Sequence, residues 1–102
     1  MATLLELKAL MSDSDLQDRV ETALLVEVQA ILAGTPTADQ QKYAAHVFSA
    51  PRTEGQKALM YVLAKHNALT VAQIQGATDT SIRSAVAEAV PVLVVAFNAG
   101  AI

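Results

Sequence analysis

The chain has 102 residues, a length that corresponds to a single domain. Hydrophobic residues make up 53% of it and charged residues only 17%, so it has ample apolar surface to bury and is not disordered. Its net charge of −3 argues against a basic nucleic-acid-binding module, and the lack of cysteine excludes disulfides and thiolate metal sites.

The N-terminal stretch predicts neither a signal peptide nor a membrane anchor. It has no basic region, and Glu6 interrupts its first apolar run. The longest nearly apolar run, residues 89–97, is far shorter than the roughly 20 residues that span a bilayer. We therefore expect a soluble protein that is made in the cytoplasm and has no membrane partner.

Capping patterns mark the predicted helix starts. In a capping box, a threonine hydroxyl accepts a free first-turn N–H, and a Glu or Gln three residues later reaches back to the N–H of the threonine. The pattern occurs four times, at Thr3/Glu6, Thr37/Gln40, Thr53/Gln56 and Thr70/Gln73. Each pair predicts the beginning of a helix.

Apolar spacing predicts two helices before the first proline. A short one covers residues 4–11, and Ser12 caps a longer one that Gly34 ends as a left-handed C-cap. Three aspartates crowd the first turns of the longer helix, where the positive end of the helix dipole favours carboxylates. Its apolar positions extend beyond one face, so we expect neighbours to cover it on two sides.

The middle of the chain predicts two further helices and one short helical turn. Residues 38–49 form a helix with Phe48 facing inward, and Pro51 ends it. The next helix covers residues 54–66. A single helical turn over residues 71–75 then closes at Gly76.

A last helix starts near Thr78. Pro91 removes one backbone N–H inside it, so a kink or a break is expected there. The uncharged segment 91–102 either continues the helix after a kink or leaves as an extended arm. The prediction is therefore an all-α fold, with residues 1–102 as one domain. It is a small bundle of four to five helices with an apolar C-terminal segment.

Catalytic, metal and nucleic-acid motifs are not recognisable. His46 and His66 are 20 residues apart with no carboxylate at a ligand-like spacing, so we expect structural roles for both. Asp13 and Asp15 resemble the start of a calcium loop, but Arg19 follows where further ligands should be. The basic residues Lys42, Arg52, Lys57 and Lys65 are spread over 24 residues, and the negative net charge works against phosphate binding. We expect no enzymatic activity, no cofactor, no metal and no specific nucleic-acid partner.

The hydrophobic content exceeds what a small helical core absorbs. A surplus of this kind is typical of a protein that buries surface against a partner. We expect an obligate oligomer or a subunit of a larger shell. The residues predicted to form the interface are Leu25, Val26, Val92, Val94, Val95, Phe97 and Ile102.

Two blocks that cover about half of the chain resemble the small all-helical structural proteins of tailed-bacteriophage virions, in the head and neck module. The first is Ser-Asp-x-Asp-Leu-x-x-Arg-Val, preceded by Leu-x-x-Leu. The second is Ala-Thr-Asp-x-x-Ile-x-x-x-Val-x-x-x-Val-Pro. The matching residues are Ser12, Asp13, Asp15, Leu16, Arg19 and Val20, then Ala77, Thr78, Asp79, Ile82, Val86, Val90 and Pro91.

The resemblance implies a virion protein that is made in the host cytoplasm. The leading expectation is a head–tail connector or adaptor subunit that assembles as a ring between portal and tail through apolar helix and tail contacts. The alternatives are a capsid decoration or cement protein and a small helical regulatory protein outside the virion. The implied partners are further copies of the chain and the portal, tail or capsid proteins.

Overall fold

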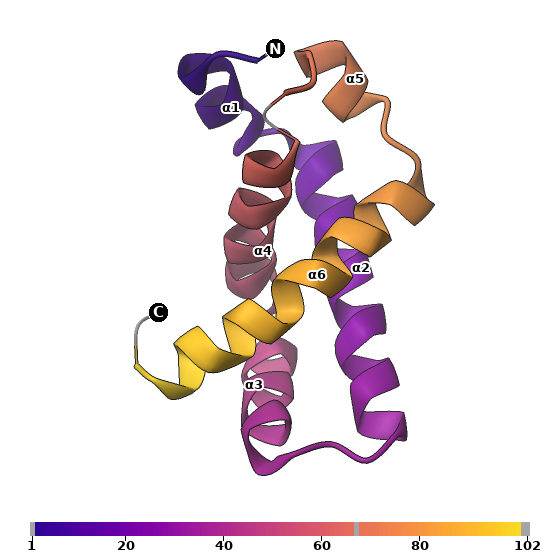
Figure 1. Ribbon diagram of the computed structural model, residues 1–102, viewed down its shortest axis with the longest axis vertical. Helices are drawn as coiled ribbons and strands as arrows, with labels where there is room; N and C mark the ends of the chain where they lie inside the picture. Colours follow the sequence, from indigo (N-terminus) through magenta and orange to yellow (C-terminus); the bar gives the residue numbers. More distant parts are fainter. Residues whose placement is uncertain (1, 67, 101–102) are drawn as a thin grey trace.

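The computed structural model describes residues 2–66 and 68–100, and this part of the chain is entirely helical in its regular structure. Figure 1 shows the helices in chain order. They are α1 (Leu4–Leu10), α2 (Ser14–Ala33), α3 (Ala38–Ser49), α4 (Pro51–Lys65), α5 (Val71–Gln75) and α6 (Asp79–Asn98). The predicted all-α small bundle is confirmed.

Three long segments build the bundle, as Figure 1 shows. The helix α2 runs along one side, and α3 and α4 follow each other in the opposite direction beside it. The helix α6 crosses them obliquely and packs against all three. The short helices α1 and α5 contact each other at the end of the bundle where α2 begins.

The core lies where α2, α4 and α6 meet. Their buried side chains recur every three or four residues, which places them on one face of each helix. The long helix α2 also packs against α3, which continues the line of α4 beside it. Among the most completely buried side chains are Leu16, Val20, Leu24, Val28, Leu59, Ile82, Val86 and Leu93.

Three of the four predicted capping boxes are formed. The threonine hydroxyl and the Glu or Gln side chain both make the expected bonds at Thr3, Thr37 and Thr70. The prediction for Thr53 is wrong, because α4 already begins at Pro51 and Thr53 lies within it. Proline suits the first helical position, since its fixed φ is helical and no N–H is needed there.

Three details of the sequence interpretation need correction. Asp13 rather than Ser12 caps α2, because its Oδ1 accepts the N–H of Leu16 at 3.1 Å. Gly34 ends α2 with φ −94°, so it is not a left-handed cap. Phe48 is 43% exposed and does not face inward, because it lies in the last turn of α3 on the side away from the core.

The helix α6 runs without interruption through Pro91 to Asn98. Of the two alternatives for the C-terminal segment, the structure therefore has the continued helix up to residue 98. By length and composition alone α6 is apolar enough to cross a membrane. Seven of its residues are nevertheless buried against the other helices, as expected of a core helix.

Candidate functional site: an apolar interaction surface

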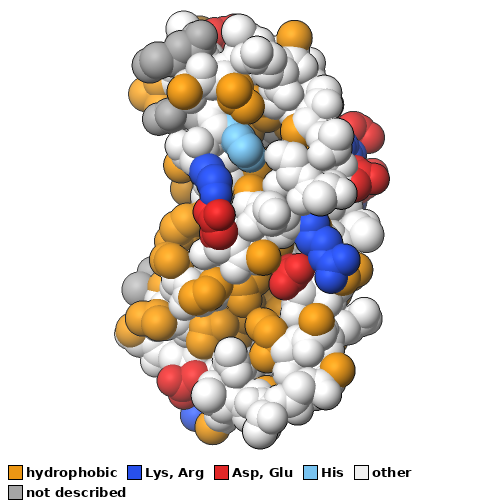
Figure 2. Space-filling view, turned by 45° about the vertical axis from the view of Figure 1, so that its right-hand side comes forward, with side chains coloured by type: hydrophobic (Ala, Val, Ile, Leu, Met, Phe, Trp, Pro, Cys, Tyr) orange, Lys and Arg blue, Asp and Glu red, His pale blue; other side chains and the backbone are white. Residues whose placement is uncertain are grey.

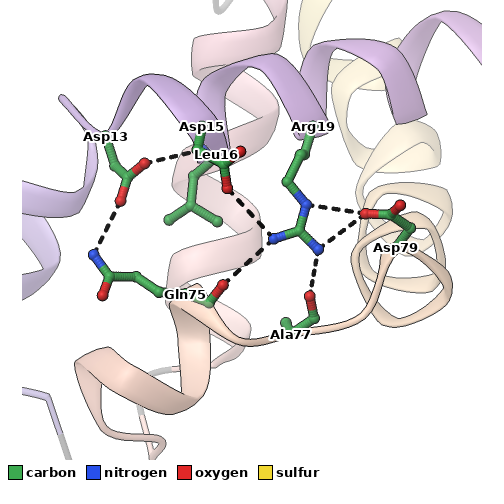
Figure 3. Close-up of polar contacts among 7 residues, drawn as sticks. All are labelled: Asp13, Asp15, Leu16, Arg19, Gln75, Ala77 and Asp79. Carbon is green, nitrogen blue, oxygen red and sulfur yellow. Dashed lines mark hydrogen bonds and ion pairs between the residues drawn. The ribbon is translucent and has the colours of Figure 1, made fainter.

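The two blocks that carry the phage resemblance meet at Arg19 (Figure 3). Arg19 Nε donates to Asp79 Oδ1 at 2.9 Å, and the guanidinium also donates to the carbonyls of Gln75 and Ala77. The side chain of Gln75 in turn donates to Asp13 Oδ2 at 3.0 Å. These contacts connect the start of α2 to the segment from α5 to α6, and we call them the Arg19 clamp. They occupy the guanidinium of Arg19.

A buried carboxylate, Glu54, was not anticipated from the sequence. Its side chain is fully buried in the first turns of α4. Its Oε1 lies 2.8 Å from His46 Nε2 and 2.9 Å from Lys57 Nζ. Its Oε2 has no hydrogen-bond partner among the described residues. The pair with His46 joins α3 to α4 across the break at Ala50, which agrees with the structural role expected for this histidine.

An aromatic side chain packs on His46, the partner of this carboxylate. The ring of Phe97 stacks on His46 with centroids 4.7 Å apart and meets Tyr43 edge-on at 5.8 Å. Tyr43 is fully buried, and its hydroxyl has no partner within the described part of the chain. Burial, and then the negative charge of Glu54, raise the pKa of Tyr43 well above its ordinary value.

This cluster contains residue types that occur in catalytic groups, but its carboxylate is fully buried. Five grooves on the surface of residues 2–66 and 68–100 are lined by other residues. Within the same residues, no three His, Asp or Glu side chains converge as metal ligands would. The geometry thus favours a structural role for Glu54, which secures the junction of α3, α4 and α6.

Exposed apolar side chains supply the stronger candidate. Six of the eight large hydrophobic residues that are exposed within the described chain lie on α1, α4 and α6. We call them the α1–α4–α6 face. Its members, with their exposed fractions, are Leu4 (82%), Leu5 (77%), Met60 (60%), Tyr61 (40%), Val92 (48%) and Val95 (70%).

Two grooves lie between the helices of this face. One, of about 340 Å³, lies between α1 and α4, with Leu4 and Met60 among its lining residues. The other, of about 320 Å³, separates α4 from α6 and is lined partly by Tyr61 and Val92. Because Met60 and Tyr61 are neighbours on α4, the outer side of this helix connects the two grooves.

A second apolar region lies beside α2. Figure 2 shows hydrophobic side chains gathered in the lower half of this view, with charged side chains around them. A groove of about 460 Å³ opens between α2, the start of α3 and α6. Its apolar lining consists of Ile31, Ala87, Val90, Pro91 and Val94.

The structure distributes the seven predicted interface residues over different environments. Val92 and Val95 are exposed on α6. Leu25 and Val26 are half-buried. Leu25 packs against the core, and Val26 lines a separate groove between the first half of α2 and the start of α6. Phe97 is half-buried against Tyr43 and His46. Val94 is only 8% exposed, because it faces the core, and Ile102 lies outside the described residues.

Four members of the face were missed in the sequence. Leu7 and Leu10 already supply the inward side of α1, so Leu4 and Leu5 are in excess. On α4 the inward side is filled by Ala58, Leu59, Val62 and Leu63, which leaves Met60 and Tyr61 outside. The sequence signal for these four residues is that α1 and α4 each contain more large apolar residues than one helical face can bury.

Comparison of the chain with protein-family models, with curated proteins and with solved structures finds no match. The resemblance to tailed-phage virion proteins therefore remains a prediction.

Proposed function

We propose that this protein is a self-associating structural subunit, and that it serves as a head–tail connector that forms a ring in the neck of a tailed-phage virion. The observation that carries the proposal is the α1–α4–α6 face, where six large apolar side chains are exposed on three helices, with one groove between α1 and α4 and another between α4 and α6. Monomeric proteins rarely leave an apolar surface of this kind open to water.

The neck setting is supported by the two sequence blocks. Although they are far apart in the chain, they meet at Arg19 and Asp79 and thus belong to one structural unit. A ring also requires two different surfaces, because each copy contacts the next one head to tail. The face and the groove beside α2 are two such surfaces.

Light scattering on the purified chain tests self-association. At micromolar concentration we expect a mass that is a multiple of the 10.7 kDa chain. A monodisperse monomer contradicts the proposal for the isolated protein.

Quantitative mass spectrometry on purified particles tests the setting. A connector is present at the copy number of one ring, whereas a decoration protein is present at hundreds of copies. Absence of the chain from the particles contradicts any virion role and favours a regulatory protein.

A further inference from the structure

We infer that the groove beside α2 binds a basic side chain, an arginine or a lysine, which a neighbouring protein presents next to an apolar residue. The inference rests on the proposed function only for the role of this groove as a contact surface. It adds the chemistry of the group that enters the groove.

The groove carries negative charge. Among the described residues that line it are two carboxylates, Glu27 and Asp39, and no lysine or arginine. Glu27 is shared with Arg83, whose Nε lies 3.0 Å from its Oε1. Asp39 is exposed, and its carboxylate takes part in no ion pair of the described chain. Its full charge outweighs the partial positive charge at the N-terminus of α3, so the complementary group is a cation.

Pro91 adds a neutral acceptor to the same groove. A proline inside a helix offers no N–H to the carbonyl four residues earlier, which in α6 is that of Ala87. Ala87 and Pro91 both line the groove. The side chains of Thr37 and Gln40, which also line it, are engaged in the capping box of α3. The carboxylate of Asp39 and the carbonyl of Ala87 are thus available to a partner.

The Arg19 clamp shows how a basic side chain satisfies acceptors of this kind. The guanidinium of Arg19 pairs with the carboxylate of Asp79 and also donates to two backbone carbonyls within residues 75–77 (Figure 3). An entering arginine has the same five donors for Asp39 and Ala87.

Apolar side chains form another part of the lining. Ile31 is half-buried on α2, and Val90 and Val94 are buried on α6. The stem of an arginine or a lysine consists of methylene groups, which pack on such a surface while the charged end reaches polar atoms. A free inorganic cation covers none of this apolar surface. An apolar residue beside the basic one covers what the stem leaves open, which points to a polypeptide as the source of the charge.

Fluorescence anisotropy with labelled synthetic peptides tests the inference. The probe is a short peptide with an arginine between two leucines, and the matched peptide has a glutamate in place of the arginine. We expect the arginine peptide to bind at least about tenfold more tightly than the glutamate peptide. Its binding should weaken as the salt concentration rises, because an exposed ion pair is screened.

Two variants of the protein each remove one acceptor. Asp39→Asn removes the charge and should weaken binding of the arginine peptide by about threefold or more. Pro91→Ala supplies the N–H that the carbonyl of Ala87 lacks, so it should raise the thermal midpoint and yet weaken binding by about twofold or more. Glu88→Gln is the control, because Glu88 is an exposed carboxylate of α6 that does not line this groove, and it should change binding by less than about twofold. Circular dichroism establishes that all three variants fold.

The outcomes separate this inference from the proposed function. If the chain self-associates but binds both peptides equally well, or if Asp39→Asn binds the arginine peptide as the unmodified chain does, the inference is overturned and self-association stands. If the chain is a monomer that prefers the arginine peptide through Asp39, the inference stands and self-association fails. Binding of free arginine amide as tight as that of the peptide overturns the inference of a protein partner.

Discussion

Arg19 and Asp79 lie 60 positions apart in the chain, and their side chains are joined at 2.9 Å between Nε and Oδ1. Arg19 is the better buried partner, with 23% of its side chain exposed against 89% for Asp79. The guanidinium also bonds the carbonyls of Gln75 and Ala77. The ion pair is therefore the exposed end of a mostly buried connection between α2 and the segment that leads into α6.

Replacing Arg19 should destabilise the fold more than replacing Asp79. We expect Arg19→Ala to lower the free energy of unfolding by about 2 kcal/mol, because two backbone carbonyls lose a charged donor. Asp79→Ala should cost less than about 1 kcal/mol, since exposed ion pairs contribute little. Urea unfolding measures both values. Arg83→Ala is the control, because Arg83 is 55% exposed and pairs only with Glu27 among the described residues. If Arg83→Ala lowers the free energy of unfolding as much as Arg19→Ala does, the Arg19 contacts have no special role in stability.

Gly55 allows α2 and α4 to approach closely. A Cβ added at Gly55 would lie 3.2 Å from the Cβ of Glu21 and 3.3 Å from its Cα. Alanine normally stabilises a helix relative to glycine by about 1 kcal/mol. The backbone of Glu21 has to move here, so we expect Gly55→Ala to be destabilising overall, by about 1–2 kcal/mol.

Thermal unfolding followed by circular dichroism measures this loss. At Gly34 an added Cβ would lie 3.6 Å from the carbonyl oxygen of Ile31, which is an ordinary van der Waals contact. Gly34→Ala should therefore leave the midpoint nearly unchanged. A stabilising effect of Gly55→Ala means that the two helices can separate without cost.

The hydroxyl of Tyr43 is buried without a partner in the described chain, so its removal should not cost stability. We expect Tyr43→Phe to leave the free energy of unfolding at neutral pH unchanged or to raise it. Urea titration measures this quantity. A loss of more than about 1 kcal/mol implies that the hydroxyl makes a hydrogen bond.

The raised pKa of Tyr43 also predicts a pH dependence. In the unfolded chain a tyrosine loses its proton near pH 10.0, whereas the folded state keeps the proton to higher pH, first because of burial and second because of Glu54. The unfolded state then binds fewer protons, so stability falls as the pH rises above about 10. Tyr43→Phe should remove this part of the slope. In a Tyr61→Phe background, the absorbance change at 295 nm should appear only above the ordinary tyrosine range.

Removal of residues 92–102 distinguishes an arm from a core segment. The deletion takes away Leu93, which is fully buried, together with Val94 and the ring of Phe97 that packs on Tyr43. Losses of about 2–5 kcal/mol for each large core side chain approach the total stability of a small domain. We expect the truncated chain to lose its cooperative thermal transition.

A shorter deletion serves as the control. A chain that ends at Asn98 keeps all of α6 and should retain the transition. If the chain truncated at residue 91 also retains it, the end of α6 does not contribute to the core.

The features that depend on a few neighbouring residues were predictable from the sequence. Thr3, Thr37 and Thr70 cap helices as expected, because each cap needs only a residue three positions away. Thr53 failed because Pro51, two residues earlier, is itself a favourable first helical residue. Local patterns thus predicted the helices, with errors of a few residues at their ends.

The features that depend on packing were not predictable. Glu54 is buried where the break at Ala50 brings His46 of α3 next to it. Val94 was assigned to an interface, but the oblique crossing of α6 turns it into the core. Such a crossing angle is decided by side chains on several helices at once. The candidate face was therefore only partly foreseen, through Val92 and Val95.

The position of α6 has a consequence for biosynthesis. It is the last helix of the described chain, and it packs against α2, α3 and α4. The core cannot close until residues 79–98 have emerged from the ribosome, and until then the sides of α2, α3 and α4 that α6 will cover remain open to water. Nascent chains on neighbouring ribosomes are exposed to premature contact at these sides, so rapid completion of α6 protects the chain from misassembly.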